Sequence, residues 1–176
     1  MFNIVICEED ANIRNLISSH VRQYFFSMKA SGKVALSTGE PQKVLEYINH
    51  SSNQENIYLF GIFYNTEMNG LTLAKEVRRS DMLGYLIYIT AYPEFSFKTF
   101  QYQLKVFNYI IKDDNLLSHI SETLDAVILE DKNRKHKEKD ELLYIHSGEL
   151  SHAISMNSII SIETTLQHKI IITTTK

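Results

Sequence analysis

The residues best suited to chemistry in this chain follow four apolar, strand-like runs. They are the adjacent acids Glu8 and Glu9, then Thr90 and Lys112, while Gly61 follows the remaining run. Adjacent carboxylates repel each other and are most readily kept ionised together by a hard cation such as Mg²⁺. A lysine offers a point charge to a phosphate, and a threonine hydroxyl can hydrogen-bond to a bound anion. The set predicts a magnesium-assisted phosphoryl-transfer pocket in which Gly61 leaves the place of a nucleophilic carboxylate without a side chain.

The elements that must position these residues alternate between strand and helix patterns. We expect strands at 2–7, 34–36, 57–64, 85–89 and 106–111, and helices after Asp10, at 42–49, from Gly70, at 93–102 and after Asp113. The stretch 57–64 is almost continuously apolar, which suits a central strand covered on both faces. Five strand-helix units in a row predict an α/β fold with a parallel sheet. Ligands of such sheets bind outside the carboxyl ends of the strands, where the candidate residues lie.

The pattern changes after the last of these helices. Residues 130–141, EDKNRKHKEKDE, are mostly charged with both signs mixed, which predicts a solvated helix extension or a linker. Short strands separated by polar turns are expected over 142–176. We therefore expect a first domain at 1–129, a charged connection at 130–141 and a β-only segment at 142–176.

Composition sets the broad class. The chain has 176 residues, of which 44% are hydrophobic and 22% charged, and a net charge of −3. These values are typical of a globular protein and give no overall electrostatic attraction to nucleic acid. No apolar run is long enough for a membrane span or a signal peptide, so we expect a cytoplasmic protein with no membrane partner. The single cysteine, Cys7, lies in an apolar run and is expected to be a buried core thiol.

Four segments carry a resemblance to a known family: CEEDANIR after the first strand, IYLFGIFYNTEMNGLTLAKEVRR around the third, IYITAYPEF at the fourth and NYIIKDD at the fifth. They resemble the receiver domain of two-component response regulators, in the AgrA/ComE-type branch joined to a LytTR DNA-binding domain. The resemblance implies a CheY-like (flavodoxin-like) doubly wound five-stranded parallel sheet with strand order 2-1-3-4-5. It also implies roles for five residues: Glu8 and Glu9 as the acidic metal-binding pair, Thr90 as the switch hydroxyl, Tyr109 as the switch aromatic and Lys112 as the phosphate-binding lysine.

Gly61 stands where members of this family have an aspartate. A receiver takes its phosphoryl group on that carboxylate, and glycine offers no nucleophile. The substitution leaves two carboxylates where the family has three, and Glu9 replaces an aspartate, so any Mg²⁺ site is expected to be weak. Glu67 and Asp10 are the nearest other acids, but neither follows the third strand directly. We expect a pseudo-receiver that is not an enzyme and is not phosphorylated at the usual site.

Without a phosphate, the two-state equilibrium of a receiver must be fixed by the sequence or biased by a partner. The aromatic residues of the segment 93–102 can be read either as core packing under a short helix or as a dimerisation face. They are Phe95, Phe97, Phe100 and Tyr102. The second interpretation predicts a homodimer or a heterodimer with an intact response regulator, and the resemblance adds a sensor histidine kinase as a possible partner.

The segment 142–176 resembles the first strands of a LytTR domain, including its Ile-Glu-Thr-Thr sequence. His168 and Lys169 match a histidine-basic pair that the family uses near DNA, although both can equally be surface residues of an incomplete sheet. Because later strands of such a domain are missing from this segment, DNA binding by this chain alone is not expected. Three hypotheses follow, in this order: a degenerate response regulator acting through protein contacts in transcriptional or quorum-sensing signalling, a phosphorylation-independent LytTR-type DNA-binding regulator, and a Mg²⁺-dependent phosphohydrolase.

Overall fold

The computed structural model describes residues 1–50, 55–139, 142–147, 150–165 and 169–175. They form two compact units, Met1–Asp125 and Ala126–Lys176. Within the described part of the chain, no helix is both long and apolar enough to cross a membrane.

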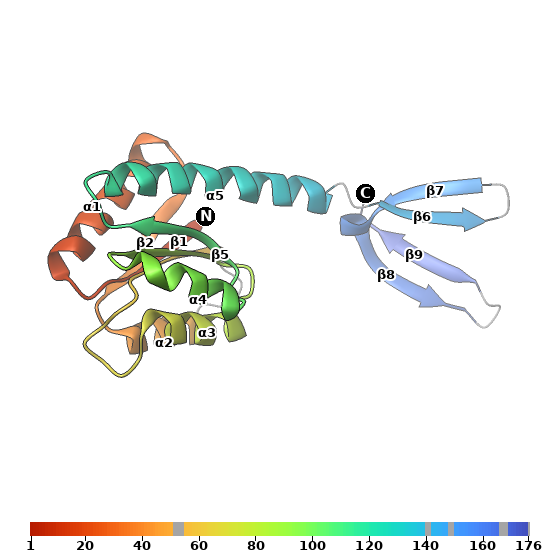
Figure 1. Ribbon diagram of the computed structural model, residues 1–176. Helices are drawn as coiled ribbons and strands as arrows, with labels where there is room; N and C mark the ends of the chain where they lie inside the picture. Colours follow the sequence, from red (N-terminus) through yellow and green to blue (C-terminus); the bar gives the residue numbers. More distant parts are fainter. Residues whose placement is uncertain (51–54, 140–141, 148–149, 166–168, 176) are drawn as a thin grey trace. The chain divides into compact units, whose positions relative to one another are not determined.

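The first unit is built on a parallel sheet whose strand order is β2-β1-β3-β4-β5, as predicted (Figure 1). The strands are β1 (Phe2–Cys7), β2 (Gly32–Thr38), β3 (Glu55–Phe60), β4 (Tyr85–Thr90) and β5 (Val106–Ile111). The helices are α1 (Ala11–Ser27), α2 (Pro41–Asn49), α3 (Gly70–Ser80), α4 (Ser96–Gln101) and α5 (Leu116–Lys139), with a 3-10 turn, η1 (Pro93–Phe95), before α4. Helices α1 and α5 lie on one side of the sheet, and α2 and α3 lie on the other (Figure 1). The predicted α/β architecture is confirmed.

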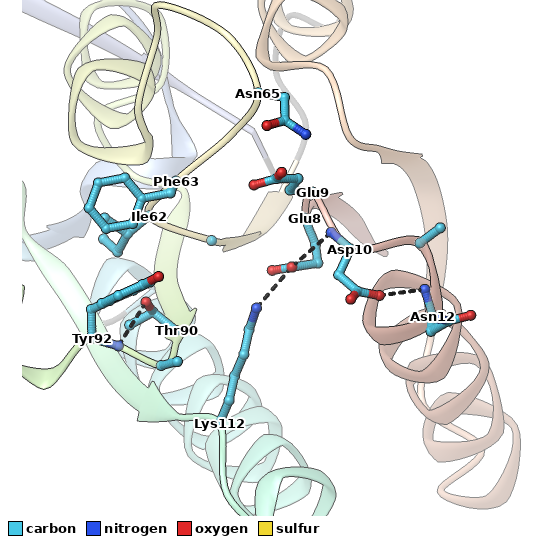
Figure 2. Close-up of a pocket in the computed structure, with 13 residues that line it drawn as sticks. Glu8, Glu9, Asp10, Asn12, Ile62, Phe63, Asn65, Thr90, Tyr92 and Lys112 are labelled. Carbon is cyan, nitrogen blue, oxygen red and sulfur yellow. Dashed lines mark hydrogen bonds and ion pairs between the residues drawn. The ribbon is translucent and has the colours of Figure 1, made fainter.

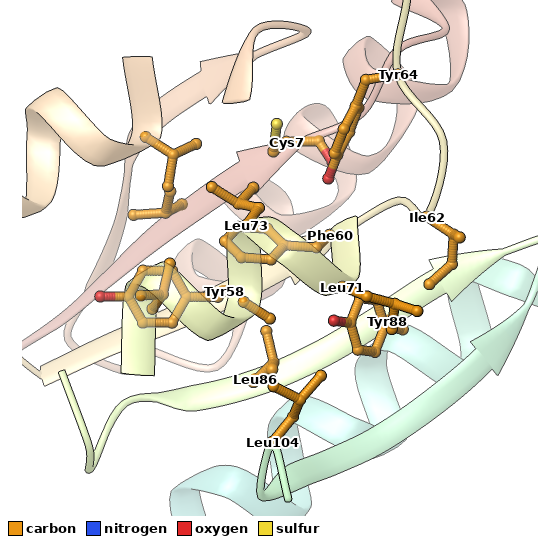
Figure 3. Packing of buried hydrophobic residues seen from close by; sticks show 14 of the residues in the cluster. Cys7, Tyr58, Phe60, Ile62, Tyr64, Leu71, Leu73, Leu86, Tyr88 and Leu104 are labelled. Atoms are coloured by element: carbon orange, nitrogen blue, oxygen red, sulfur yellow. The ribbon is translucent and has the colours of Figure 1, made fainter. Parts of the chain in front are cut away.

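The central strands are buried on both faces. Tyr58 and Phe60 of β3 and Tyr88 of β4 have no exposed surface, and they pack with residues of α3 in one apolar cluster (Figure 3). The prediction that the third strand continues to residue 64 was wrong, because β3 ends at Phe60. Ile62 and Tyr64 are buried from the following loop instead, where the Tyr64 hydroxyl donates to the backbone carbonyl of Gly61 at 3.0 Å.

Strand register brings the predicted site residues to one edge of the sheet. Cys7 pairs with Phe60, so the residues after β1 and β3 are neighbours, and the Gly61 amide donates to the Cys7 carbonyl at 2.9 Å. On the other side of the sheet centre, the Lys112 amide donates to the Thr90 carbonyl at 2.9 Å. Parallel ladders thus extend one residue beyond the strands and fix the backbone beneath the site.

Helix α3 begins directly against this edge. Asn69 caps it by accepting from the Thr72 amide at 2.9 Å, and the Gly70 amide donates to the Ile62 carbonyl at 2.7 Å. A Cβ atom on Gly70 would lie 2.0 Å from the Gly61 carbonyl oxygen, so only glycine permits this close approach. The loop between β3 and α3 is therefore tied to the site at both of its ends.

The second unit contains the later turns of α5 and two β-hairpins. The charged segment predicted at 130–141 is helical to Lys139, and residues 140–141 lie outside the described part. Strand β6 (Leu142–Ser147) pairs with β7 (Leu150–Ser155), and β8 (Ile159–Thr164) pairs with β9 (Ile170–Thr174), both antiparallel. The β-only pattern is confirmed, while the domain boundaries at 129 and 141 stay predictions.

Candidate functional site

A cavity of about 540 Å³ lies at the carboxyl edge of the sheet. Its lining includes the five residues singled out from the sequence, Glu8, Glu9, Gly61, Thr90 and Lys112. They come from the ends of β1, β3, β4 and β5, which strand register places side by side. The tertiary structure thus brings together groups that are up to 104 residues apart in the chain.

Glu8 and Lys112 form the central interaction of the cavity. The Lys112 Nζ atom donates to Glu8 Oε1 at 2.8 Å, and the Asp10 amide donates to the same oxygen at 3.1 Å (Figure 2). The Glu8 side chain is only 6% exposed, and that of Lys112 is 23% exposed. A carboxylate so deeply buried is costly unless it is paired, and Lys112 supplies that pairing.

Glu9 differs from its neighbour, because its side chain is exposed and lies on the side of Asn65 (Figure 2). The backbone of the acidic pair is held by Arg14 of α1, whose Nη1 atom donates to the carbonyls of Glu8 at 2.6 Å and Glu9 at 3.0 Å. The two adjacent acids therefore have different environments, and it is Glu8 that pairs with Lys112.

Asp10 is the N-cap of α1, as predicted. Its Oδ1 atom accepts from the amides of Asn12 at 2.7 Å and Ile13 at 3.1 Å. These two hydrogen bonds from backbone amides lower the pKa of the Asp10 carboxyl, and the one from Ile13 has the larger effect. The carboxylate is engaged in starting the helix, at some distance in sequence from the end of β3.

Thr90 and Tyr109 both hold the backbone of Tyr92 in the loop after β4. Thr90 is buried and its Oγ1 atom accepts from the Tyr92 amide at 3.2 Å, while the Tyr109 hydroxyl donates to the Tyr92 carbonyl. The Tyr109 ring is half-buried against Tyr88, and burial, followed by the charge of Glu94, raises the pKa of Tyr109 to about 12. The predicted switch pair thus shares one loop residue.

No nucleophile stands at the end of β3. Gly61 has no side chain, and Glu67 is exposed in the loop beyond it. The buried Cys7 thiol precedes the acidic pair, but burial raises its pKa to about 12, so it stays protonated and unreactive near neutral pH.

The residues at this edge do not fit a strongly held divalent cation. Among the described residues, no group of three carboxylate, histidine or cysteine side chains is placed to bind a metal ion. Glu8 already has Lys112 as its counter-ion, and Gly61 contributes no oxygen from a side chain. Two carboxylates, one of them neutralised, are a poor substitute for the oxygen-rich shell that Mg²⁺ prefers.

The aromatic residues of the segment 93–102 divide into two groups. Phe95 is half-buried and packs edge-to-face on Phe63 at 5.1 Å between ring centroids. Phe97 and Phe100 of α4 are 67% and 79% exposed, and Tyr102 is 44% exposed. The core-packing interpretation was therefore wrong for Phe97 and Phe100, because a helix as short as α4 can turn only one of its sides towards the sheet.

Two aromatic residues near the cavity were missed by the sequence reasoning. Phe63, in the loop after β3, stacks edge-to-face on Tyr92, in the loop after β4, at 4.8 Å between ring centroids. Both line the cavity. The available signal was an aromatic residue three positions after the end of β3 and another two positions after the end of β4. Lys169, assigned to a DNA contact, is exposed before β9, and His168 lies outside the described residues.

Comparisons with known proteins agree on the first unit. The chain is 32% identical over 111 residues to accessory gene regulator protein A of Staphylococcus epidermidis, and equally to that of Staphylococcus aureus, covering 63% of this chain and 46% of each relative. The chain thus spans about half the length of the curated relatives that it matches. No family model matches the sequence.

Solved structures share the fold at lower identity. The response regulatory domain of protein mrkE from Klebsiella pneumoniae has a TM-score of 0.63 at 20% identity, covering 76% of this chain and 99% of that domain. The response regulator TrrA from Thermotoga maritima, determined in complex with Mg²⁺-BeF, has a TM-score of 0.54 at 18% identity, with 70% and 99% covered. The first unit therefore has the CheY-like receiver fold, and 111 residues of the chain are similar in sequence to accessory gene regulator A proteins.

Proposed function

We propose that this chain is a degenerate response regulator, a pseudo-receiver that is not phosphorylated at the usual site and signals through protein contacts. The observation that carries the proposal is Gly61, which directly follows β3 and lines a cavity that otherwise has the acids, the threonine and the lysine of a receiver pocket. The similarity to accessory gene regulator A proteins supports a place in transcriptional or quorum-sensing control. The protein acts without catalysing a reaction.

The remaining acids support this proposal because each one near the cavity already has another task or position. Glu8 is paired with Lys112, and Asp10 caps α1. Glu9 is exposed on the side of Asn65, and Glu67 is exposed in the loop after β3. Covalent catalysis needs a nucleophile at the place where the phosphoryl group is delivered. Glu8 and Glu9 bind Mg²⁺ only weakly, since the third carboxylate is missing.

The test of this proposal is phosphoryl transfer from a small phosphodonor in the presence of Mg²⁺. Wild type is expected to incorporate no phosphate, whereas Gly61→Asp is expected to become labelled. An intact accessory gene regulator A protein serves as the positive control for the donor. Labelling of wild type that disappears in Glu9→Gln or Glu67→Gln would overturn the proposal.

Protein contacts are proposed to use the exposed aromatic face of α4, formed by Phe97, Phe100 and Tyr102. Lys75 lies over the Tyr102 ring at 3.6 Å, so the face combines apolar rings with a positive charge. The partner is a second copy of the chain or an intact response regulator, and a sensor histidine kinase is a further candidate. Exposed rings of this size favour association once a complementary surface covers them.

Sedimentation equilibrium can test the face with a matched control. Phe97→Ser combined with Phe100→Ser is expected to raise the dissociation constant of the dimer, or of the heterodimer with an intact response regulator, by at least tenfold. Phe26→Ser is the control, because Phe26 is 87% exposed on α1. An equal effect of both variants, or none, would count against this face. If Gly61→Asp becomes phosphorylated, its dimerisation is expected to strengthen with labelling.

The alternative function is a phosphorylation-independent DNA-binding regulator that uses the hairpins of the second unit. The exposed side chain of Lys169 is the described group that favours it. A gel-shift assay with direct-repeat promoter DNA separates the two functions, since specific binding by the purified chain at moderate salt would favour the alternative.

A further inference from the structure

The carboxylate of Glu8 fills the space that Gly61 leaves open. A Cβ atom built on Gly61 would lie 2.9 Å from Glu8 Oε2, while its next neighbours, a carbonyl oxygen of Cys7 and a ring carbon of Tyr64, would be 3.7 Å away. Gly61 also has an ordinary backbone conformation that permits a side chain. Among the described residues, Glu8 is therefore the one that a Cβ atom at residue 61 would meet at less than an ordinary van der Waals distance.

The other oxygen of Glu8, Oε1, is bound by the lysine of the cavity and by a backbone amide. Oε1 accepts from Lys112 at 2.8 Å and from the Asp10 amide at 3.1 Å, so one buried carboxylate occupies both the lysine and a backbone donor. These two donors, a lysine and an amide at the start of a helix, are of the kind that bind phosphate oxygens. In this chain they are already bound by an internal anion.

We infer that Glu8 is a built-in anion that occupies the phosphate position of the pocket, and that Gly61 is the residue that makes room for it. The inference rests on the proposed function and adds how its site is regulated. An external phosphate must displace a carboxylate that is covalently part of the chain and therefore has a high effective concentration at the site. Wild type thus does not bind inorganic phosphate at Lys112, and the pocket does not respond to phosphorylated ligands.

The same geometry explains why two adjacent acids behave differently. Glu8 is buried and paired, whereas Glu9 is exposed and turned towards Asn65. Removal of either one changes the net charge of the cavity by the same amount, but only removal of Glu8 frees Lys112. The neighbouring residue is therefore a control for electrostatics in the same pocket.

The test is the titration of inorganic phosphate, followed by the amide and side-chain NMR signals of Lys112. Glu8→Ala is expected to bind phosphate at least tenfold more tightly than wild type, and the gain is expected to disappear in Glu8→Ala combined with Lys112→Met. Glu9→Ala is expected to behave as wild type.

Two results would overturn the inference. One is an equal gain in Glu9→Ala, which would show that net charge alone controls anion binding. The other is phosphate binding by wild type with a shift of the Lys112 signals, a measurement that needs no folded variant. Phosphate titration involves no covalent step, so its outcome is independent of phosphodonor labelling, which tests the proposed function.

Discussion

The effect of Gly61→Ala on the free energy of unfolding should change sign when Glu8 is also replaced. In wild type, the new methyl group would lie 2.9 Å from Glu8 Oε2, well inside the ~3.5 Å of an ordinary non-bonded contact. Glu8 must then move, and its 2.8 Å hydrogen bond with Lys112 is lost or lengthened. A hydrogen bond to a charged group contributes about 2 kcal/mol to stability.

The added methyl group also has a favourable effect. Its burial and the reduced conformational freedom of the unfolded chain together add about 1 kcal/mol to the free energy of unfolding. Gly61→Ala should therefore lower the free energy of unfolding by about 1 kcal/mol in wild type and raise it by about 1 kcal/mol in a Glu8→Ala background. The coupling energy of the double-mutant cycle is then about 2 kcal/mol.

Urea unfolding followed by circular dichroism measures this cycle, and the chain contains no tryptophan that would offer a simpler signal. Glu8→Gln is the shape-matched control. Its amide still fills the space over Gly61, so Gly61→Ala should remain destabilising there. Equal effects of Gly61→Ala in the wild-type and Glu8→Ala backgrounds would refute the placement of Glu8 over Gly61.

Three further predictions concern groups around the sheet. Arg78→Met should lower the free energy of unfolding by at least about 3 kcal/mol, since the buried guanidinium donates to four backbone carbonyls, at 2.7 to 3.1 Å; Arg79→Met, whose side chain is 75% exposed, should change it by less than about 0.5 kcal/mol in the same urea titration. Cys7 should resist iodoacetamide at pH 8 until the protein unfolds, because burial raises its pKa to about 12; the stability that its thiol contributes is complete below the unfolded pKa of about 8.5 and is lost as pH rises towards 12, so fast native labelling would contradict the buried position. Asp10→Ala should reduce stability at pH 7 more than Asp10→Asn. Because the folded pKa of Asp10 is lowered, the stability that wild type has over either variant should shrink as pH falls through that pKa. Thermal unfolding at pH 7 and below pH 4 can check this.

Much of the fold followed from local pattern. The apolar period changes from strand to helix five times, and N-cap residues such as Asp10 mark where a helix begins, so the number and order of elements were predictable. The end of β3 was not predictable from the sequence. Apolar residues continue from Ile57 to Tyr64 because the loop after the strand is also buried, and a continuous apolar run contains no alternation that marks where pairing stops.

The sequence by itself determined that two acids, a threonine and a lysine follow strand ends and that Gly61 stands among them without a carboxylate. Only the tertiary structure decided that Glu8, and not Glu9, turns inward, because neighbouring residues at a strand end point in different directions and the turn before α1 selects between them. Packing also decided that the space over Gly61 is filled by this carboxylate. A buried charge must find its counter-ion within reach, and Lys112 comes within reach only when β5 takes its place in the sheet.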